Sequence, residues 1–312
     1  MLVALVRTIP VAAMLSILIP EYNYDCSALV GDLRAQAERL RLKTGADYEI
    51  IVGDDASDDV ATTAANSEAC GGPRCRFVRN PVNFGRARNR NMMARMAKGD
   101  FLLFIDCDAE VCDGSFLARY AEAAVNGDVV CGGISSPAEL PSADVKLRYK
   151  YERNARKVRS VAYRLKNPYA HFSTFNFMIR RQLFLGIMFD ENCVEYGYED
   201  ALFGLRLKQR GIHVEHIDNP LVHVGMDTNE SFVNKCEQAM RTLKRLDADM
   251  KEYSHVGSMA MKLKRFRLIW AVKAWHLLFR KLELANLLGK RPSLFVLKAY
   301  KLGYFCYIGG AE

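Results

Sequence analysis

The chain has 312 residues, half of them hydrophobic, so it is longer than one typical domain and can bury a large core. Its nine cysteines are scattered, and Cys70 and Cys75 lack a second pair at zinc spacing, which excludes a zinc module and indicates reduced thiols in a cytosol. The net charge of +8 comes with no RNA- or DNA-binding motif, so nucleic acid is not an expected partner.

The first predicted strand covers residues 15–19. Residues 1–20 are apolar, but Arg7 and Pro10 interrupt them, and cleavage as a signal peptide would remove this strand. We therefore expect residues 1–13 to be an N-terminal extension. The strand ends in Pro20-Glu-Tyr-Asn23, a turn that can place the ring of Tyr22 against a nucleobase. A core or lid tyrosine is the alternative. Residues 27–42 then carry apolar side chains at helical spacing.

A second strand is predicted at residues 48–52, followed by the acidic sequence Gly53-Asp-Asp-Ala-Ser-Asp-Asp59. An acidic side chain just past a strand can accept hydrogen bonds from a base imide or a ribose hydroxyl, and we assign this role to Asp55. Ser57 or Asp58 is the expected N-cap of a helix that begins near Val60, because short polar side chains accept hydrogen bonds from the free amides there.

A third apolar run, residues 101–105, leads directly into Asp106-Cys-Asp108. It predicts a buried strand, and the carboxyl ends of strands are where open α/β sheets bind ligands. Two carboxylates there can hold a hard divalent cation. An acidic turn after an edge strand is the alternative. Strands alternating with helical stretches predict βαβ units, but no Gly-x-Gly-x-x-Gly follows any strand and no P-loop occurs, which argues against a dinucleotide site.

Five sequence blocks, in this order and spacing, resemble glycosyltransferase family 2, whose members have the A-type nucleotide-sugar transferase fold. They are Pro20-Glu-Tyr-Asn23, residues 53–59, Asn83-Phe-Gly-Arg-Ala-Arg-Asn89, Asp106-Cys-Asp108 and Glu195-Tyr-Gly-Tyr-Glu-Asp200, the last preceded by the similar segments 175–181 and 189–191. The resemblance covers about residues 14–226. The chain departs from the family at Glu21, where Thr or Ser is frequent, and at Cys107 in the middle of the acidic pair.

This resemblance implies a mixed, mostly parallel α/β sheet flanked by helices, Rossmann-like. The sequence beyond the region of resemblance predicts a helical C-terminal extension. It implies a metal-dependent enzyme that uses Mn²⁺ or Mg²⁺, held by Asp108 with Asp106 and His223 as further ligands. The residues it implies for binding the nucleotide-sugar are Pro20, Tyr22, Asp55, Gly85, Arg86, Arg90, Asp106 and Asn176. Arg86 and Arg90 are one helical turn apart and are expected to share a face.

The acidic block implies the catalytic base of an inverting displacement, which takes the proton of the acceptor hydroxyl. We assign this role to Asp200, with Glu199 second. The alternative is acidic charge that complements the dipole at the start of the helix predicted at residues 202–210. For His223, a buried hydrogen-bonded histidine is an equal alternative to a ligand of the metal or the diphosphate.

The positive charge is concentrated near the C-terminus. Residues 259–308 hold eleven Lys or Arg and a single acid, Glu283, whereas the rest of the chain is nearly neutral. The region is also rich in Leu, Phe, Trp and Tyr but has no run of about eighteen apolar residues that could span a bilayer. We expect it to bind an anionic membrane surface as a peripheral element. A helical pair packed on the catalytic domain is the alternative.

Together these observations predict an N-terminal extension at 1–13, a catalytic domain at 14–228 and a helical basic extension at 229–312. The predicted function is inverting transfer of a sugar, from a UDP-sugar by resemblance, to a saccharide or lipid-linked saccharide in surface glycan synthesis. We expect the enzyme in the cytoplasm, on the inner face of the membrane. The alternatives are a sugar-phosphate nucleotidyltransferase, which would need a Gly- and Arg-rich loop after the first strand, and a non-catalytic nucleotide-sugar-binding protein.

Overall fold

The three apolar runs form the centre of a parallel sheet in the computed structural model, which describes residues 13–155, 158–193 and 195–308. Strand β1 (Leu15–Glu21) lies between β2 (Tyr48–Asp54) and β4 (Phe101–Ile105), and β3 (Cys75–Arg79) extends the sheet beyond β2. Every residue of β2 and β4 is buried, as expected for strands covered on both faces. The parallel register brings the ends of β1, β2 and β4 to one edge.

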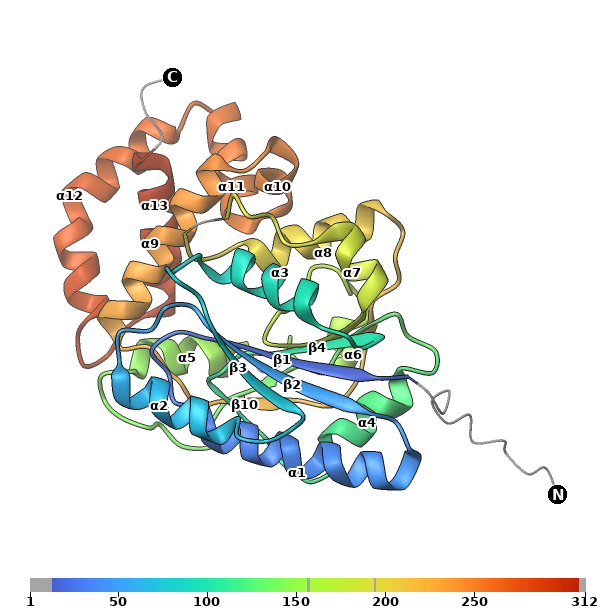
Figure 1. Ribbon diagram of the computed structural model, residues 1–312. Coiled ribbons are helices and arrows are strands. Elements are labelled where there is room, and N and C mark those ends of the chain that lie inside the picture. Colours follow the sequence, from blue (N-terminus) through green and yellow to red (C-terminus); the bar gives the residue numbers. More distant parts are fainter. Residues whose placement is uncertain (1–12, 156–157, 194, 309–312) are drawn as a thin grey trace. The chain divides into compact units, whose positions relative to one another are not determined.

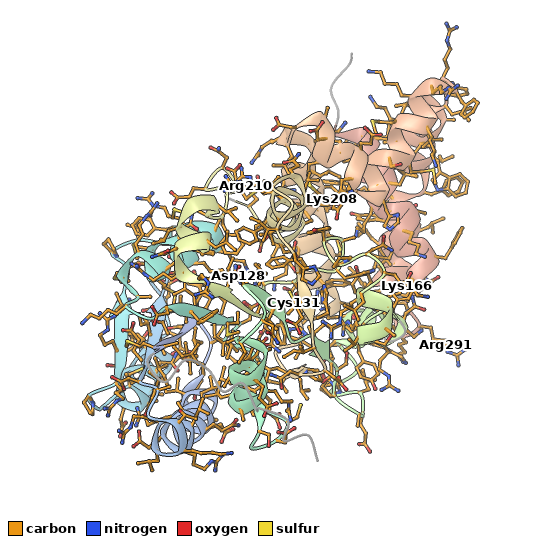
Figure 2. All side chains as sticks on the ribbon, turned by 90° about the vertical axis from the view of Figure 1, so that its right-hand side faces the viewer. Asp128, Cys131, Lys166, Lys208, Arg210 and Arg291 are labelled. Carbon is orange, nitrogen blue, oxygen red and sulfur yellow. The ribbon has the colours of Figure 1, made fainter. Side chains whose placement is uncertain are left out.

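The other half of the sheet is mixed. Strand β8 (Asn176–Arg180) runs antiparallel to both β4 and β6 (Val129–Cys131), whose flanking Asp128 and terminal Cys131 are labelled in Figure 2. Strand β9 (Glu215–His216) completes the order β3-β2-β1-β4-β8-β6-β9. A second sheet of three short strands places β10 (Leu221–His223) between β5 (Ala109–Glu110) and β7 (Ile134–Ser135).

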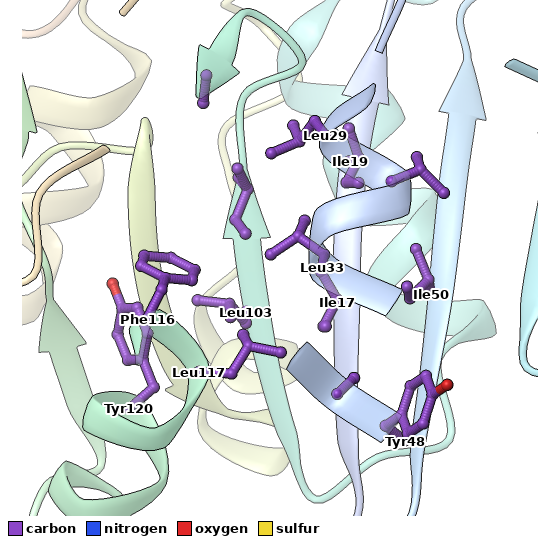
Figure 3. Packing of buried hydrophobic residues seen from close by; sticks show 14 of the residues in the cluster. Ile17, Ile19, Leu29, Leu33, Tyr48, Ile50, Leu103, Phe116, Leu117 and Tyr120 are labelled. Atoms are coloured by element: carbon purple, nitrogen blue, oxygen red, sulfur yellow. The ribbon is translucent and has the colours of Figure 1, made fainter. Parts of the chain in front are cut away.

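Helices cover both faces of the large sheet (Figure 1). On one face, α1 (Ser27–Thr44) and α4 (Phe116–Ala123) pack on alternate strand residues such as Ile17, Ile50 and Leu103 (Figure 3), and the end of α2 (Val60–Ala69) joins the same cluster. On the other, α3 (Arg86–Met96), α7 (Arg181–Ile187) and the later turns of α8 (Glu199–Gln209) pack on Leu18, Ile51 and Phe104. The short helix α6 (Val161–Arg164) precedes β8. Side chains that alternate between two buried faces account for the continuous apolar runs.

The start of α2 corrects one prediction. The helix begins at Val60 as expected, but its N-cap is Asp59, whose carboxylate accepts hydrogen bonds from the amides of Ala61 and Thr62. The prediction of Ser57 or Asp58 as the cap was wrong. The amide of Ser57 instead donates to Asp54, because the loop makes one more turn before the helix starts.

The chain divides into two compact units. The first comprises residues 1–135, 157–191 and 203–225, and the second comprises 136–156, 192–202 and 226–312. The second unit contains α5 (Lys146–Asn154) and the first turn of α8. Its other described helices are α9 (Asn229–Arg245), α10 (Ala248–Tyr253), α11 (His255–Arg265), α12 (Ile269–Leu287) and α13 (Leu294–Tyr307). The predicted domain limits stay a prediction, and residues 1–12 lie outside the described residues.

The predicted fold class is confirmed: a mixed, mostly parallel α/β sheet flanked by helices, followed by a helical C-terminal region. Among the described residues, none of the helices combines the length and apolar character needed to cross a bilayer.

Candidate active site

The carboxylate of Asp106 is fixed by a buried arginine. Asp106 follows β4 directly, and its amide donates to the carbonyl of Phe175 at 3.1 Å. Arg90 reaches it from α3, with Nη2 at 2.5 Å from Oδ1, and the Arg90 side chain is almost entirely buried. A charge-assisted bond of this kind sets the orientation of Asp106 before any ligand arrives.

Asp108 is held beside His223 by the small sheet. The amide of Val224 donates to the Asp108 carbonyl, and His223 lies opposite Ala109 in the β5–β10 ladder. His223 Nε2 is 3.0 Å from Asp108 Oδ2. The imidazole is buried, with the ring of Phe175 packed against it edge to face. This geometry fits both a buried hydrogen-bonded histidine and a ligand, so the role of His223 stays a prediction.

Asp108 lies so close to Gly225 that there is no room for a side chain at position 225. A Cβ at Gly225 would lie 2.5 Å from Asp108 Cβ and 3.0 Å from its Oδ2. The half-buried Tyr24 also borders Gly225, and burial together with the negative charge of Asp108 raises the pKa of its phenol to about 12. Tyr24 is therefore neutral at physiological pH and can donate a hydrogen bond.

The donor set at Asp108 fits a divalent cation that takes much of its coordination from a phosphate ligand. Among the described residues, no three or more His, Cys, Asp or Glu side chains converge to hold a metal. Asp108 and His223 nevertheless offer one oxygen and one nitrogen ligand at the edge where β4 ends. Mg²⁺ in nucleotide sites uses one or two carboxylates plus substrate phosphates and water, and imidazole suits Mn²⁺ as well.

Asp55 organises the glycine loop. Its Oδ1 accepts hydrogen bonds from Asn80 Nδ2 and the amide of Phe84, and its Oδ2 accepts one from the amide of Gly85, all at 2.8–2.9 Å. Gly85 has φ +82° and precedes the first turn of α3, so a residue with a side chain would be strained there. Asp55 thus fixes the entry to α3, and its contact with a donor stays a prediction.

The first two loops are joined to each other. Asn23, at φ +51°, donates its amide to Ser57 Oγ, and its side-chain oxygen accepts from the amides of Asp58 and Asp59. Pro20 lies within β1 opposite Gly53, and Tyr22 just beyond is 46% exposed. An exposed ring on a fixed loop is available for stacking, although its partner stays a prediction.

A buried carboxyl pair beneath these loops had no role in the sequence-based predictions. Glu21 and Asp54, the last residues of β1 and β2, lie opposite each other in the register and are both buried. Burial and the negative charge of Asp54 raise the pKa of Glu21 to about 7. Asp54 is balanced by Arg79 Nε at 3.3 Å. The departure of Glu21 from the family pattern was the sequence feature that pointed here.

Two further predicted donor-binding residues differ in their surroundings. Arg86 is exposed at the first position of α3, and Arg90 follows one helical turn later on the same side of the helix but is buried. Asn176 is buried. Its Nδ2 donates to the carbonyls of Gly133 and Asn219, and its Oδ1 accepts from the Tyr120 hydroxyl. These bonds account for Asn176 without a ligand, and donor binding by Asn176 stays a prediction.

The acidic block lies in the second unit and is shaped by a glycine. Gly197 has φ +98°, and a Cβ there would lie 2.7 Å from the Cβ of Ala239 in α9. Tyr198 follows at φ +69°, after which α8 begins at Glu199. Glu199 is buried, and Asp200 Oδ1 accepts from the amide of Ala201 at 2.7 Å. Acidic residues in the first turn and Arg206 and Lys208 in the last also fit the helix dipole.

The fold and the first unit's site define an α/β protein with a candidate ligand site at the carboxyl ends of its parallel strands. The model of the family described as Glycosyl transferase family 2 matches residues 16–186, more than half of the chain. The chain belongs to this family.

Individual glycosyltransferases match this chain over short stretches or at low sequence identity. An uncharacterized glycosyltransferase of Haemophilus influenzae is 36% identical over 95 residues, which cover 30% of this chain and 29% of that protein. YfnE of Bacillus subtilis, also an uncharacterized glycosyltransferase, is 25% identical over 262 residues, 65% of each chain. WcaA of Escherichia coli K12, named for colanic acid biosynthesis, is 29% identical over 154 residues, covering 45% of this chain and 53% of WcaA. The chain thus spans less than two thirds of these relatives.

Solved structures share the fold at low sequence identity. The mannosyltransferase PcManGT from Pyrobaculum calidifontis, in complex with GDP-Man and Mn²⁺, superposes with a TM-score of 0.57 at 14% identity, over 94% of this chain and 84% of that chain. TarS of S. aureus superposes with a TM-score of 0.50 at 16% identity, over 93% of this chain and 55% of TarS.

Proposed function

We propose that this chain is a metal-dependent, inverting glycosyltransferase. It moves a hexosyl or N-acetylhexosaminyl group from a nucleotide-diphosphate donor, UDP by resemblance, to a saccharide or lipid-linked saccharide during surface glycan synthesis. The observation that carries the proposal is the pair Asp106 and Asp108 at the end of β4, each held by a neighbouring side chain. The family membership and the relative named for colanic acid biosynthesis support the reaction class and the acceptor class.

The proposed donor site uses the joined loops at the strand ends. Tyr22 stacks on the base, and Asp55 keeps the glycine loop in place beside it. Arg86, at the exposed first turn of α3, meets a phosphate, and Asp106, oriented by Arg90, accepts from a ribose hydroxyl or a water. Oriented groups of this kind reduce the ordering cost of binding.

Asp108 and His223 would hold the Mn²⁺ or Mg²⁺ ion. The ion supplies stabilisation of the negative charge that develops on the leaving diphosphate. On the acceptor side, Asp200 takes the proton of the attacking hydroxyl, and Glu199 orients the acceptor. Attack from the face opposite the diphosphate inverts the anomeric carbon.

The basic region 259–308 gives the enzyme a second partner in this proposal. With a net charge of +10, it brings a cytoplasmic enzyme to the inner face of an anionic membrane, where a lipid-linked acceptor is available.

A donor screen tests the reaction class. The purified protein is incubated with individual UDP- and GDP-sugars, with Mn²⁺, with Mg²⁺ or with EDTA, and released nucleotide diphosphate is measured. We expect release from one donor class with metal and none with EDTA. No release from any donor would contradict the proposal, and pyrophosphate production from a sugar phosphate and UTP would favour a nucleotidyltransferase.

A further inference from the structure

Helix α12 has its polar and apolar faces reversed relative to a helix on the surface of a water-soluble protein. Its outward sector is almost entirely apolar, and Trp270 and Leu278 are 70% and 74% exposed. The sector consists of Trp270, Ala274, Trp275, Leu277, Leu278, Lys281, Leu282, Ala285 and Leu288 just past its end. A surface helix normally directs its charged residues toward water and its apolar stripe toward the core.

The inward sector of α12 carries polar residues in addition to the buried Leu287. His276 and Glu283 are buried, with His276 Nδ1 at 3.1 Å from Glu283 Oε2. Arg280, the next residue on this side, is 3.3 Å from Glu237 of α9, which also accepts a hydrogen bond from Tyr300 of α13. These polar bonds fix the rotation of the helix, because turning the apolar sector inward would leave buried charges without their partners.

The fit between α12 and α13 depends on a small residue. The two helices lie side by side within the second unit (Figure 1). A Cβ at Gly303 of α13 would lie 2.8–2.9 Å from the ring atoms and Cβ of His276. The close approach keeps His276 enclosed, so the outward direction of the tryptophans is a property of the folded unit.

Basic side chains flank the apolar sector along the chain. Exposed cations precede α12, and others follow it in the loop to α13, where Arg291 is labelled in Figure 2. They are Lys262, Lys264, Arg265 and Arg267 before the helix and Lys290 and Arg291 after it. Phe266 and Phe295, 69% and 80% exposed, add apolar area next to these cations.

We infer that the outward sector of α12 inserts into the headgroup region of an anionic lipid bilayer, with the flanking cations on the lipid phosphates. Apolar side chains enter the acyl boundary, tryptophan rings favour the interface, and Lys or Arg pair with anionic headgroups. A second copy of the chain fits less well, because two surfaces with this positive charge repel each other. The inference deepens the membrane partner of the proposed function but requires none of its sugar chemistry.

The two tryptophans of the chain make the insertion measurable, since both lie in the outward sector. Intrinsic fluorescence of the full-length protein is recorded with phosphatidylglycerol-containing vesicles, with phosphatidylcholine vesicles and with brominated-lipid vesicles, at low and high salt. We expect a blue shift with the anionic vesicles, quenching by brominated acyl chains, and partial persistence of both at high salt. No shift and no quenching with any vesicle would overturn the inference.

A paired substitution tests the face itself. Leu278→Glu with Leu282→Glu should lower partitioning into anionic vesicles about tenfold or more, because two exposed apolar contacts become charged. Leu42→Glu, at a 72% exposed leucine of α1, is the matched control and should bind like the wild type. Circular dichroism checks that the variants fold.

Three results would count against the inference. Equal loss of vesicle binding in the Leu42→Glu control would show that any added negative charge weakens binding. Vesicle binding that is abolished by salt and leaves the fluorescence unshifted would indicate a purely electrostatic tail. A blue shift that grows with protein concentration in the absence of lipid, with dimers in sedimentation, would assign the face to a second copy. None of these measurements uses a sugar donor, so they are independent of the catalytic proposal.

Discussion

Asp108 is positioned by its neighbours more than by its own strand. The His223 ring, Tyr24 and the bare backbone of Gly225 surround its carboxylate. Tyr24 follows β1, whereas His223 and Gly225 lie at and just past the end of β10, which the β5–β10 ladder holds beside Asp108. Because its orientation is already restricted, the Asp108 carboxylate loses little conformational entropy when it binds a cation.

Gly225→Ala tests this confinement. The new methyl group would overlap Asp108 and displace the carboxylate, so we expect metal-dependent UDP affinity to fall about 10- to 100-fold, as for other changes to residues that orient metal ligands. Titration calorimetry with UDP and Mn²⁺ measures it. Gly31→Ala is the control, because a Cβ there meets nothing within 4 Å. Unchanged affinity in Gly225→Ala would show that Asp108 does not need this space.

Asp200→Asn separates binding from proton transfer. The amide has nearly the same shape but cannot accept the proton, so turnover should fall by on the order of 10²–10⁴ while donor affinity stays within a few-fold. Steady-state transfer assays and UDP titration give the two quantities. If Glu199→Gln is the inactive variant instead, the two roles are exchanged. If both variants turn over normally, neither residue is the base.

The residue types at the site were predictable, but their partners were not. The sequence placed Asp106 and Asp108 after a buried strand, which the structure confirms. It could not show that Arg90 turns inward to Asp106 while Arg86 stays exposed, because that choice depends on where α3 packs. Gly225 follows His223 closely, yet its contact with Asp108 arises only from pairing between strands distant in the chain.

At the level of elements, the ends of β1 and β2 meet in the Glu21–Asp54 pair. When two buried carboxyl groups lie side by side, ionising both of them is unfavourable in free energy. Glu21 therefore keeps its proton in the folded state up to about pH 7, whereas in the unfolded chain it loses it near its ordinary pKa of 4.5. The pair makes the junction of the two loops sensitive to pH.

Glu21→Gln should remove part of the pH dependence of stability. Because the pKa of Glu21 is raised in the folded state, this residue does not change the free energy of unfolding below about pH 4.5. It lowers that free energy progressively as the pH rises to about 7. The glutamine variant should therefore be more stable than the wild type above pH 7, by on the order of 1–3 kcal/mol. Denaturant unfolding across this range measures it. The exposed Glu68→Gln variant is the control. Parallel curves for wild type and Glu21→Gln would contradict the account.

The strands that the sequence predicted best are those buried on both faces. Continuous apolar runs gave β1, β2 and β4 within about two residues. The antiparallel placement of β8 between β4 and β6 had no local indicator, because pairing direction depends on the path of the intervening chain. The apolar pattern of α12 was also ambiguous in the sequence, since that helix buries His276 and Glu283 beside Leu287 and exposes many of its apolar residues.

At the level of the whole molecule, the C-terminal helices both expose and bury apolar side chains, and the membrane-binding and packing alternatives drawn from the sequence stay predictions. They carry the exposed apolar sector, and they also supply the core of the second unit. Leu287 of α12 and Leu297 and Tyr300 of α13 pack with Leu147 of α5 and Phe232 of α9. A region with both features cannot be a detachable tail.

Truncation after Tyr253 should therefore expose this core. We expect the shortened chain to aggregate or to express insolubly, because α5 and α9 lose their apolar partners. A chain ending at Ile308 keeps those contacts and serves as the control. Size-exclusion chromatography compares the two. A monodisperse, folded truncated protein would show that the C-terminal helices contribute little to the stability of the second unit.

The most direct test of the catalytic account is metal-dependent UDP binding by wild type and Asp108→Ala. Calorimetric titrations are run in Mn²⁺ and in EDTA, with Asp128→Ala, an exposed acid paired to Arg180 on the surface, as the control. We predict that Mn²⁺ strengthens UDP binding to the wild type and the control, and that Asp108→Ala binds weakly with no benefit from Mn²⁺. Equal affinity of wild type in Mn²⁺ and EDTA, or Mn²⁺-dependent binding retained in Asp108→Ala, would contradict it.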